Sequence, residues 1–168
     1  MKHNILITYA SRYGSTAEIA ERIGAVISRN GLNARVAEVR EVYDLKEYTA
    51  VVIGSAVYVG RWRKDAIRFM KVHEKDLSEK DVWIFSTGPT GTGDPVKLLE
   101  GWKMPKALEP VVSRIRPKDI TVFHGAVDPE KLSGLHRFMV KKVEAPVGDF
   151  RDWEAIEAWA GIISDSLK

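Results

Sequence analysis

The chain alternates short apolar runs with segments of helical periodicity, and this alternation restricts its fold class more than any other feature. The apolar runs cover Ile5–Tyr9, Ala34–Val39, Ala50–Ser55, Val82–Ser86 and Ile120–Val127. Continuous apolar runs of this length are typical of parallel strands that helices cover on both faces. The sequence therefore predicts an α/β protein with a doubly wound, five-stranded parallel sheet in the order 2-1-3-4-5 and helices on both faces.

Apolar residues at helical spacing fill the segments between these runs. The predicted helices are Thr16–Arg29, Asp65–His73, Pro105–Ile115 and a last helix that begins at Asp152. Asn30 and Gly31 are expected to end the first helix, and Asp152 is the expected N-cap of the last. The chain has 168 residues, with no internal repeat and no linker, so we expect one domain over residues 1–168.

The composition limits the available chemistry. The chain contains no cysteine, which excludes disulfides, thiolate catalysis and cysteine-ligated clusters. Its four histidines show no spacing typical of a metal site, and no serine has an evident histidine and acid partner for nucleophilic catalysis. We therefore expect no metal ligands and no catalytic side chains, and any redox chemistry requires a bound cofactor.

Charge and hydropathy bear on location and partners. The net charge of +3 is a small excess that permits a basic patch, and no segment resembles a nucleic-acid-binding module. No apolar stretch approaches the length of a membrane span, and the first run is too short for a signal peptide, so a cytoplasmic protein is expected. The stretch Leu135–Val143 mixes apolar and basic residues. It fits either an ordinary helix with a solvated basic face or peripheral contact with an anionic membrane surface.

In a sheet of this order, ligands bind beyond the carboxyl ends of the strands, so the loops after the first, third and fourth strands form the candidate site. The first loop combines hydroxyl groups, a glycine that allows close backbone approach and the N-terminus of a helix, all of which suit a phosphate group. The alternative is a polar strand-to-helix turn that binds nothing. The residues predicted to bind in this loop are Ser11, Arg12, Tyr13, Gly14, Ser15 and Thr16.

Other phosphate-binding families lack support in the sequence. The chain contains no G-x-x-x-x-G-K-[ST] motif, which argues against a P-loop nucleotidase. No G-x-G-x-x-G follows the first strand, which argues against a dinucleotide site. The strand ends also lack the acidic cluster of a receiver domain.

The first loop resembles the phosphate loop of flavodoxins, [ST]-x-T-G-x-T, at Ser11, Gly14 and Thr16. Tyr13 departs from that pattern, because it stands where a short hydroxyl residue such as threonine is usual. The resemblance covers essentially the whole chain. It implies non-covalent binding of FMN, with the phosphate in this loop and the flavin ring between the second and third loops.

The second loop, Gly54–Trp62, resembles the flavodoxin loop that flanks the flavin ring. The resemblance implies backbone groups near the flavin N5, stacking by Tyr58 or else by Trp62, and a peptide at Gly60 that reorients when the flavin is reduced. The residues predicted to bind the cofactor here are Ser55, Ala56, Val57, Tyr58 and Gly60.

The third loop, Ser86–Pro95, carries three glycines and three threonines, which suit backbone contacts to a flat polar heterocycle. It lacks the aromatic residue that flavodoxins often stack there, so the outer face of the ring is either open to a partner or covered by Trp102. A flexible surface loop is the alternative. The predicted binding residues are Thr87, Gly88, Pro89, Thr90, Gly91, Gly93 and Asp94.

A narrower resemblance is to the flavodoxin-type, menaquinone-dependent protoporphyrinogen dehydrogenases. It is carried by VVIGSAVYVGRWRKDAIRFMKVH, HGAVDP, HRFMVKK and DWEAIEAWA, which begin at Val51, His124, His136 and Asp152. It implies an FMN-dependent oxidoreductase that passes electrons from a small organic donor to a quinone. The segment Lys97–Arg116 does not match the basic insertion of that group, which leaves the substrate open.

Two other functions remain open at this point. One is a small electron carrier between redox proteins, although carrier flavodoxins are commonly acidic and this chain is slightly basic. The other is a flavin-free α/β binding module, which Tyr13 and the missing third-loop aromatic would favour.

Overall fold

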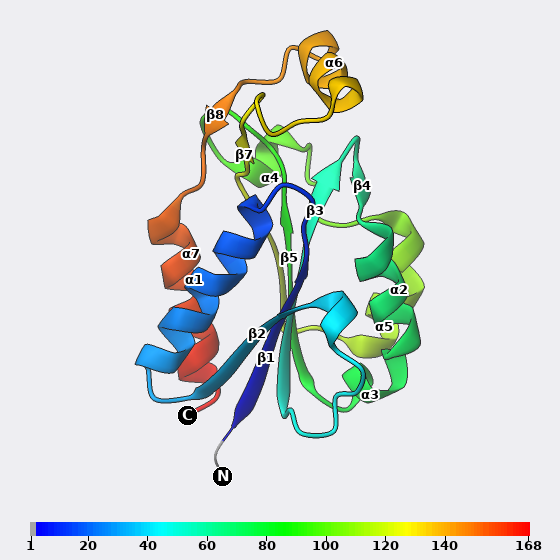
Figure 1. Cartoon of the computed structure of the whole chain (residues 1–168). Coiled ribbons are helices and arrows are strands. Elements are labelled where there is room, and N and C mark those ends of the chain that lie inside the picture. The colour runs from blue at the N-terminus through cyan, green and yellow to red at the C-terminus, as the bar shows by residue number, and fades with distance from the viewer. Residues whose placement is uncertain (1–2) are drawn as a thin grey trace.

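Five parallel strands form the central sheet (Figure 1). The computed structural model describes residues 3–168, so the first two residues of the predicted domain range lie outside it. The strands lie in the order β2-β1-β3-β5-β6, which confirms the predicted order 2-1-3-4-5 once only the parallel strands are counted. Their bounds are β1 Asn4–Ala10, β2 Asn33–Glu38, β3 Ala50–Tyr58, β5 Asp81–Thr87 and β6 Asp119–Phe123.

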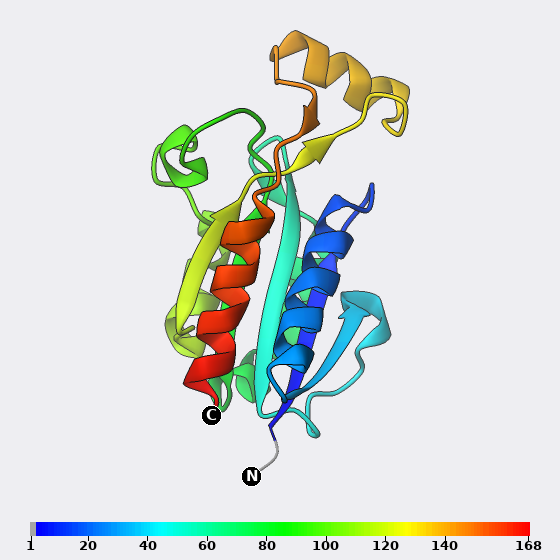
Figure 2. The ribbon, with the colours of Figure 1, turned by 90° about the vertical axis from the view of Figure 1, so that its left-hand side faces the viewer.

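Helices cover both faces of this sheet, as predicted (Figures 1 and 2). On one face lie α1, Ser15–Arg29, and α7, Trp153–Ser166. On the other lie α2, Lys64–Val72, α3, Glu74–Ser78, and α5, Glu109–Ile115. Within residues 3–168, no helix is both long and apolar enough to cross a membrane.

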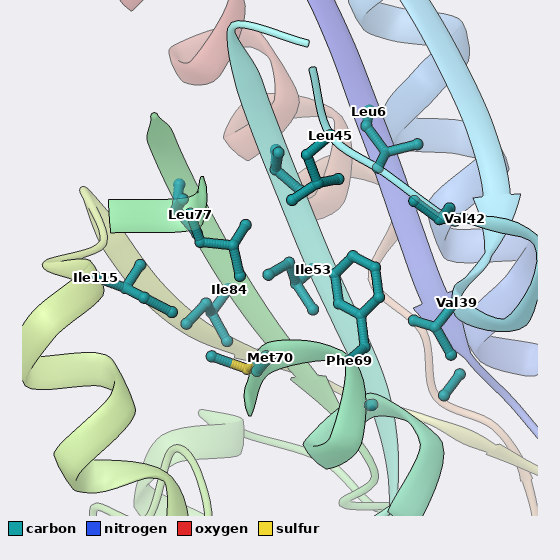
Figure 3. Close-up of a cluster of buried hydrophobic side chains, with 14 of the residues drawn as sticks. Leu6, Val39, Val42, Leu45, Ile53, Phe69, Met70, Leu77, Ile84 and Ile115 are labelled. Atoms are coloured by element: carbon teal, nitrogen blue, oxygen red, sulfur yellow. The ribbon is translucent and has the colours of Figure 1, made fainter. Parts of the chain in front are cut away.

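The core consists of two apolar layers, one on each face of the sheet. Successive side chains of β1 point to opposite faces, so Ile5 and Ile7 pack beneath α1 and α7, and Leu6 packs towards α2 (Figure 3). All three side chains are fully buried. This two-sided burial explains why the strands read as continuous apolar runs rather than as an alternation with polar residues.

The third strand extends further than predicted. It runs to Tyr58 and turns through Val59 and Gly60 into β4, Arg61–Trp62, which pairs antiparallel with its end. The predicted end of this strand at Ser55 is therefore wrong, because the next three residues, Ala56–Tyr58, also belong to β3. Both turn residues have positive φ, 51° and 68°, and this geometry closes the tight hairpin.

The predicted fifth strand, Ile120–Val127, is also wrong in its second half. The strand β6 ends at Phe123, and β7, Ala126–Val127, leaves the sheet to pair antiparallel with β8, Gly148–Asp149. Between β7 and β8 runs a segment that we call the arm, residues 128–147, which carries α6, Gly134–Lys142. The arm lies above the carboxyl ends of the strands (Figures 1 and 2).

The long connection between β5 and β6 is only partly helical. The helix predicted over Pro105–Ile115 is divided into a 3-10 turn, η2 at Lys106–Leu108, and α5, which begins at Glu109 with a proline in its first turn. A further short helix, α4 at Pro95–Leu98, precedes it, and a 3-10 turn, η1 at Val39–Glu41, follows β2. Both predicted helix ends are confirmed, since α1 stops at Arg29 and the Asp152 side chain accepts a hydrogen bond from Ala155 N.

Candidate functional site

A cavity of about 300 Å³ lies where the carboxyl ends of β1, β3 and β5 meet the arm. Its floor comes from the three loops or strand ends that the sequence singles out, and its roof comes from the arm. This volume is in the range of ligand pockets, at the sheet edge where doubly wound folds bind ligands. Among the residues predicted to bind, those that line it are Tyr13, Ser15, Ala56, Val57, Tyr58, Thr87, Gly88 and Thr90.

The first loop presents an open helix N-terminus beside the cavity. Gly14 is the N-cap of α1 in a left-handed conformation, with φ 92°, and no side chain caps the helix there. A Cβ atom placed on Gly14 would meet nothing within 4 Å, so the approach to the helix end is open. Ser11 supports the turn, because its Oγ accepts a 3.1 Å hydrogen bond from Gly14 N. Uncapped N–H groups and a helix dipole at a cavity wall fit a phosphate group.

The first and third loops are tied together beneath the cavity. Thr16 and Thr87 are both buried, and their hydroxyl oxygens lie 2.7 Å apart in a hydrogen bond. The two hydroxyls are therefore committed to each other. Thr16 lies behind the cavity wall and fixes the distance between two loops that sequence reasoning treated separately.

At the end of β3, the hairpin places only some of the predicted residues on the cavity. Ser55 is buried, and its Oγ donates to the Ala56 carbonyl and accepts from Arg63 N, so it joins β3 to the start of α2. Trp62 is only 3% exposed, and its Nε1 donates to Ser86 Oγ at 2.8 Å. The prediction that Trp62 could stack on a flavin is wrong, because its ring belongs to the core.

The third loop is held by the residues that follow β6. The two ring nitrogens of His124 lie 3.0 Å from the Pro89 carbonyl oxygen and 2.6 Å from that of Gly93. Gly125 N donates to the same Pro89 oxygen at 3.1 Å. This anchoring explains why the predicted fifth strand is interrupted at His124 and Gly125, since both leave the sheet to support the loop.

Several predicted residues of the site lie beside the cavity rather than on it. Asp94 caps α4 by accepting from two backbone N–H groups, Val96 N and Lys97 N. Trp102 lines an adjacent hollow, so it does not cover the main cavity as one interpretation of the sequence expects. Gly60 and Pro89 line this same hollow. The cavity is not lined by Ser11, Arg12, Gly14, Thr16, Ser55, Gly91, Gly93 or Asp94.

A cluster of three aromatic rings closes one side of the cavity. It consists of Tyr13 from the first loop, Tyr58 from the end of β3 and His136 from α6. His136 stacks on Tyr58, with ring centroids 5.6 Å apart and an interplanar angle of 13°, and its Nδ1 is hydrogen-bonded to the Tyr13 hydroxyl. Sequence reasoning missed His136 as a site residue, because it is 123 positions from Tyr13.

Burial and charge shift the titration of two members of this cluster. Desolvation raises the pKa of Tyr58 to about 12. Desolvation, together with the positive charges of Arg12 and Arg63, lowers the pKa of His136. At neutral pH the site therefore presents a neutral phenol and a neutral imidazole.

Arg151 is a second site residue that sequence reasoning missed. Its side chain is only 10% exposed and forms ion pairs with Glu18 of α1 and Asp149 of β8. It also donates to the Ser15 carbonyl oxygen at 3.3 Å. Arg151 thus joins the base of the arm to the first turn of α1, where the open N-terminus lies, and its hydrogen bonds lower the pKa of Asp149.

The arm contributes a mostly apolar roof with a few charged groups. No single pattern in the sequence marks these residues, although HRFMVKK, one of the segments that carry the narrower resemblance, supplies three of them. The residues of the arm that line the cavity are Asp128, Lys131, Leu132, His136, Met139, Val140, Val143 and Ala145.

Comparison with known proteins assigns this architecture to a family. A model of the flavodoxin domain matches residues 6–153, which is most of the chain. The chain belongs to the flavodoxin family. Protoporphyrinogen IX dehydrogenase [quinone] from Escherichia coli (strain K12) is 25% identical over 166 residues, covering 92% of this chain and 91% of that protein. The chain is therefore a flavodoxin-fold redox protein.

Solved structures support the same fold for this flavodoxin-family protein. Rubredoxin oxygen:oxidoreductase from Desulfovibrio gigas superimposes with a TM-score of 0.66 and 13% identity, over 98% of this chain and 36% of that chain. A flavodoxin variant of Fusobacterium nucleatum, solved bound to flavin mononucleotide, matches with a TM-score of 0.52 and 17% identity. That match covers 71% of this chain and 68% of the other. At these identities the likeness concerns the fold.

Proposed function

We propose that residues 1–168 act as one domain that binds FMN non-covalently in the cavity, and that the protein oxidises a small organic donor with a quinone as acceptor. The observation that carries this proposal is the cavity itself, which the first loop, the end of β3, the third loop and an uncapped helix N-terminus jointly border. Overall, the donor gives up two electrons and two protons, and the quinone takes them up as a quinol. Bound FMN supplies the redox centre between them.

The chain's own residues hold and orient the cofactor in this proposal. The N–H groups at the start of α1, with Ser15 at the cavity wall, bind the phosphate. The end of β3, with Tyr58, and the backbone at Gly88 border the space for the ring. The hydrogen bond between Thr16 and Thr87 fixes the spacing between the start of α1, which binds the phosphate, and the end of β5, which borders the space for the flavin ring.

An enzyme is favoured over an electron carrier because the arm encloses the cavity. A carrier exchanges electrons through an exposed ring edge, whereas the apolar roof of Leu132, Met139 and Val140 offers apolar contacts to a small organic molecule. The E. coli relative, protoporphyrinogen IX dehydrogenase [quinone], points the same way. Turnover of reduced organic donors with a soluble quinone distinguishes the two: a carrier would reduce only protein partners.

The exposed residues of α6 favour this helix as the place where the quinone acceptor reaches the protein. Leu135 and Phe138 are 68% and 63% exposed, and Arg137, Lys141 and Lys142 lie on the same helix. Exposed apolar residues among basic ones suit an anionic membrane surface, and quinones reside in membranes. We propose peripheral contact of α6 with such a surface.

The first test is the visible absorption spectrum of the purified protein, before and after addition of FMN. Flavin bands, or quenching of added FMN fluorescence, are the expected result. A colourless protein that leaves FMN fluorescence unchanged would contradict the proposal, and the flavin-free binding module would replace it.

A variant at the start of α1 separates cofactor binding from folding. Ser15→Asp places a negative charge at a helix N-terminus, which favours the helix, but the same charge repels a phosphate. We expect an unchanged or raised melting temperature together with loss of FMN. Ser113→Asp, on the exposed side of α5, introduces the same charge away from the cavity and should keep its FMN.

A further inference from the structure

The arm contributes little burial of its own. None of the residues of α6 is buried, and the arm joins the body through β7 and β8, two strands of two residues each. A helix with so little buried surface depends on specific contacts to keep its position. The aromatic cluster supplies such contacts, since it joins α6 to the first loop and to β3.

The hydrogen bonds of the cluster join the first loop to the start of α6. The Tyr13 hydroxyl oxygen accepts a 3.4 Å hydrogen bond from Ser133 N, at the N-cap of α6. The same hydroxyl is hydrogen-bonded to His136 Nδ1. The stacked Tyr58 ring covers one face of His136, and the Tyr13 ring meets it nearly edge-on, at 82°. His136 is thus held by two residues that border the cavity, Tyr13 and Tyr58.

We propose that His136 is a positioning residue that latches the arm over the cofactor, with Tyr13 and Tyr58 as its two partners. This inference rests on the proposed binding of FMN. Tyr13 precedes Gly14, whose backbone shapes the phosphate site, and Tyr58 borders the space for the ring. The latch therefore joins both ends of the cofactor site to its roof, and it closes the route by which FMN leaves.

The same assignment accounts for the departure of the first loop from the flavodoxin pattern. A threonine at position 13 is too short to reach α6, whereas the tyrosine hydroxyl contacts both Ser133 and His136. Tyr13, which stands where a short hydroxyl residue is usual in flavodoxins, thus holds the arm in position.

FMN dissociation rates test the latch directly. They are measured by stopped-flow fluorescence after dilution of the FMN-loaded protein. His136→Ala removes the stack and the hydrogen bond, and we expect dissociation to become about tenfold faster. Tyr13→Phe removes only the hydrogen bond and should speed dissociation by roughly threefold. Val147→Ala changes an exposed residue of the arm outside the cluster and the cavity lining, and should leave the rate unchanged.

His136→Phe provides a rescue that a merely structural role would not produce. It keeps an aromatic ring for Tyr58 but cannot form the hydrogen bond with Tyr13, so its rate should fall between those of wild type and His136→Ala. Wild-type dissociation rates in both His136 variants would overturn the latch while leaving FMN binding intact.

Amide hydrogen exchange of the FMN-free protein supplies a second, independent readout. His136→Ala should speed exchange across residues 134–143 and leave exchange in β1, β3 and α7 unchanged. Equal exchange in the arm of wild type and variant would overturn the latch even where FMN binds. A wild-type protein that binds no FMN would overturn the proposed function. It would also overturn the role of His136 in retaining the cofactor.

Discussion

At the scale of single residues, Gly54 is the tightest point of the sheet. It lies in β3 beside β5, and a Cβ atom there would come within 2.0 Å of the Phe85 ring. Phe85 is fully buried between Phe123 and Trp159, so its ring has no free space to occupy. The absence of a side chain at Gly54 is therefore a packing requirement of the core beneath the site.

Gly54→Ala should destabilise the fold by about 1–3 kcal/mol, because the added methyl group overpacks the core. Gly161→Ala is the matched control: a Cβ atom there meets nothing within 4 Å, and alanine favours the helix α7. Urea unfolding of both variants should show opposite signs. A neutral Gly54→Ala would mean that the Phe85 ring can move aside.

The titration of His136 makes the arm sensitive to pH. Its pKa is lowered from the ordinary value of 6.5, first by desolvation and then by the charges of Arg12 and Arg63. The closed arm thus favours the neutral imidazole. The resulting stabilisation of closure is fully present above pH 6.5, and it is lost as the pH falls from there through the lower pKa of the closed state.

An NMR titration of the His136 ring proton checks this shift. We expect a midpoint below 6.5, and a midpoint closer to 6.5 in Arg12→Gln, because Arg12 is exposed and its replacement removes one repelling charge without disturbing the core. A wild-type midpoint at or above 6.5 would contradict the burial of His136 in the closed cluster.

At the scale of elements, the ends of helices are well determined by local sequence. Asp152 caps α7 with its Oδ1 3.0 Å from Ala155 N, and Asp152→Ala should cost about 1 kcal/mol. Asp165→Ala removes the same side chain from the last turn of that helix, where an acid has no capping role, and should change stability little. Thermal unfolding compares the two. Equal losses would mean that the capping bond contributes nothing.

The same contrast between local and distant information explains what the sequence predicts about the fold. The positions of the five parallel strands and their order follow from apolar runs and helical spacing, which are local properties of the chain. The extension of β3 to Tyr58 and the departure of β7 from the sheet do not, because they depend on partners such as β4 and β8. Their physical cause is pairing across a turn or across the whole arm, which no local periodicity records.

The candidate site divides in the same way. The three regions that border the cavity follow from the fold class, since ligands bind beyond the carboxyl ends of parallel strands. His136 and Arg151 were not predictable, because their partners in the first loop and α1 lie more than a hundred residues away. Trp62 is the alternative to Tyr58 that the resemblance offers for stacking on the ring, but the hairpin turns it into the core, where its N–H donates to Ser86 Oγ.

At the scale of the whole molecule, the arm with α6 lies at the end of the sheet that borders the cavity, and the start of β1 and the end of α7 lie at the other (Figures 1 and 2). A membrane that contacts the outer face of α6 would therefore lie at the same end of the molecule as the cavity. This arrangement lets one surface serve both binding to the membrane and exchange of a lipid-soluble acceptor. The apolar and the basic residues of α6 then make separate contributions to binding, of which salt screens only the basic one.

Sedimentation with lipid vesicles tests this surface. We expect the protein to bind vesicles that contain anionic lipid, with each basic residue near the surface contributing about 1 kcal/mol, and to be released at high salt. Replacing Leu135 and Phe138 together by serine should abolish binding, because it removes the apolar anchors and leaves the charges. Ile162→Ser, on α7, removes an equally exposed apolar residue, 66%, away from the arm and should bind like wild type. If the double variant bound as wild type does, α6 would not be the contact surface. Equal binding to neutral vesicles would show that the basic residues play no part.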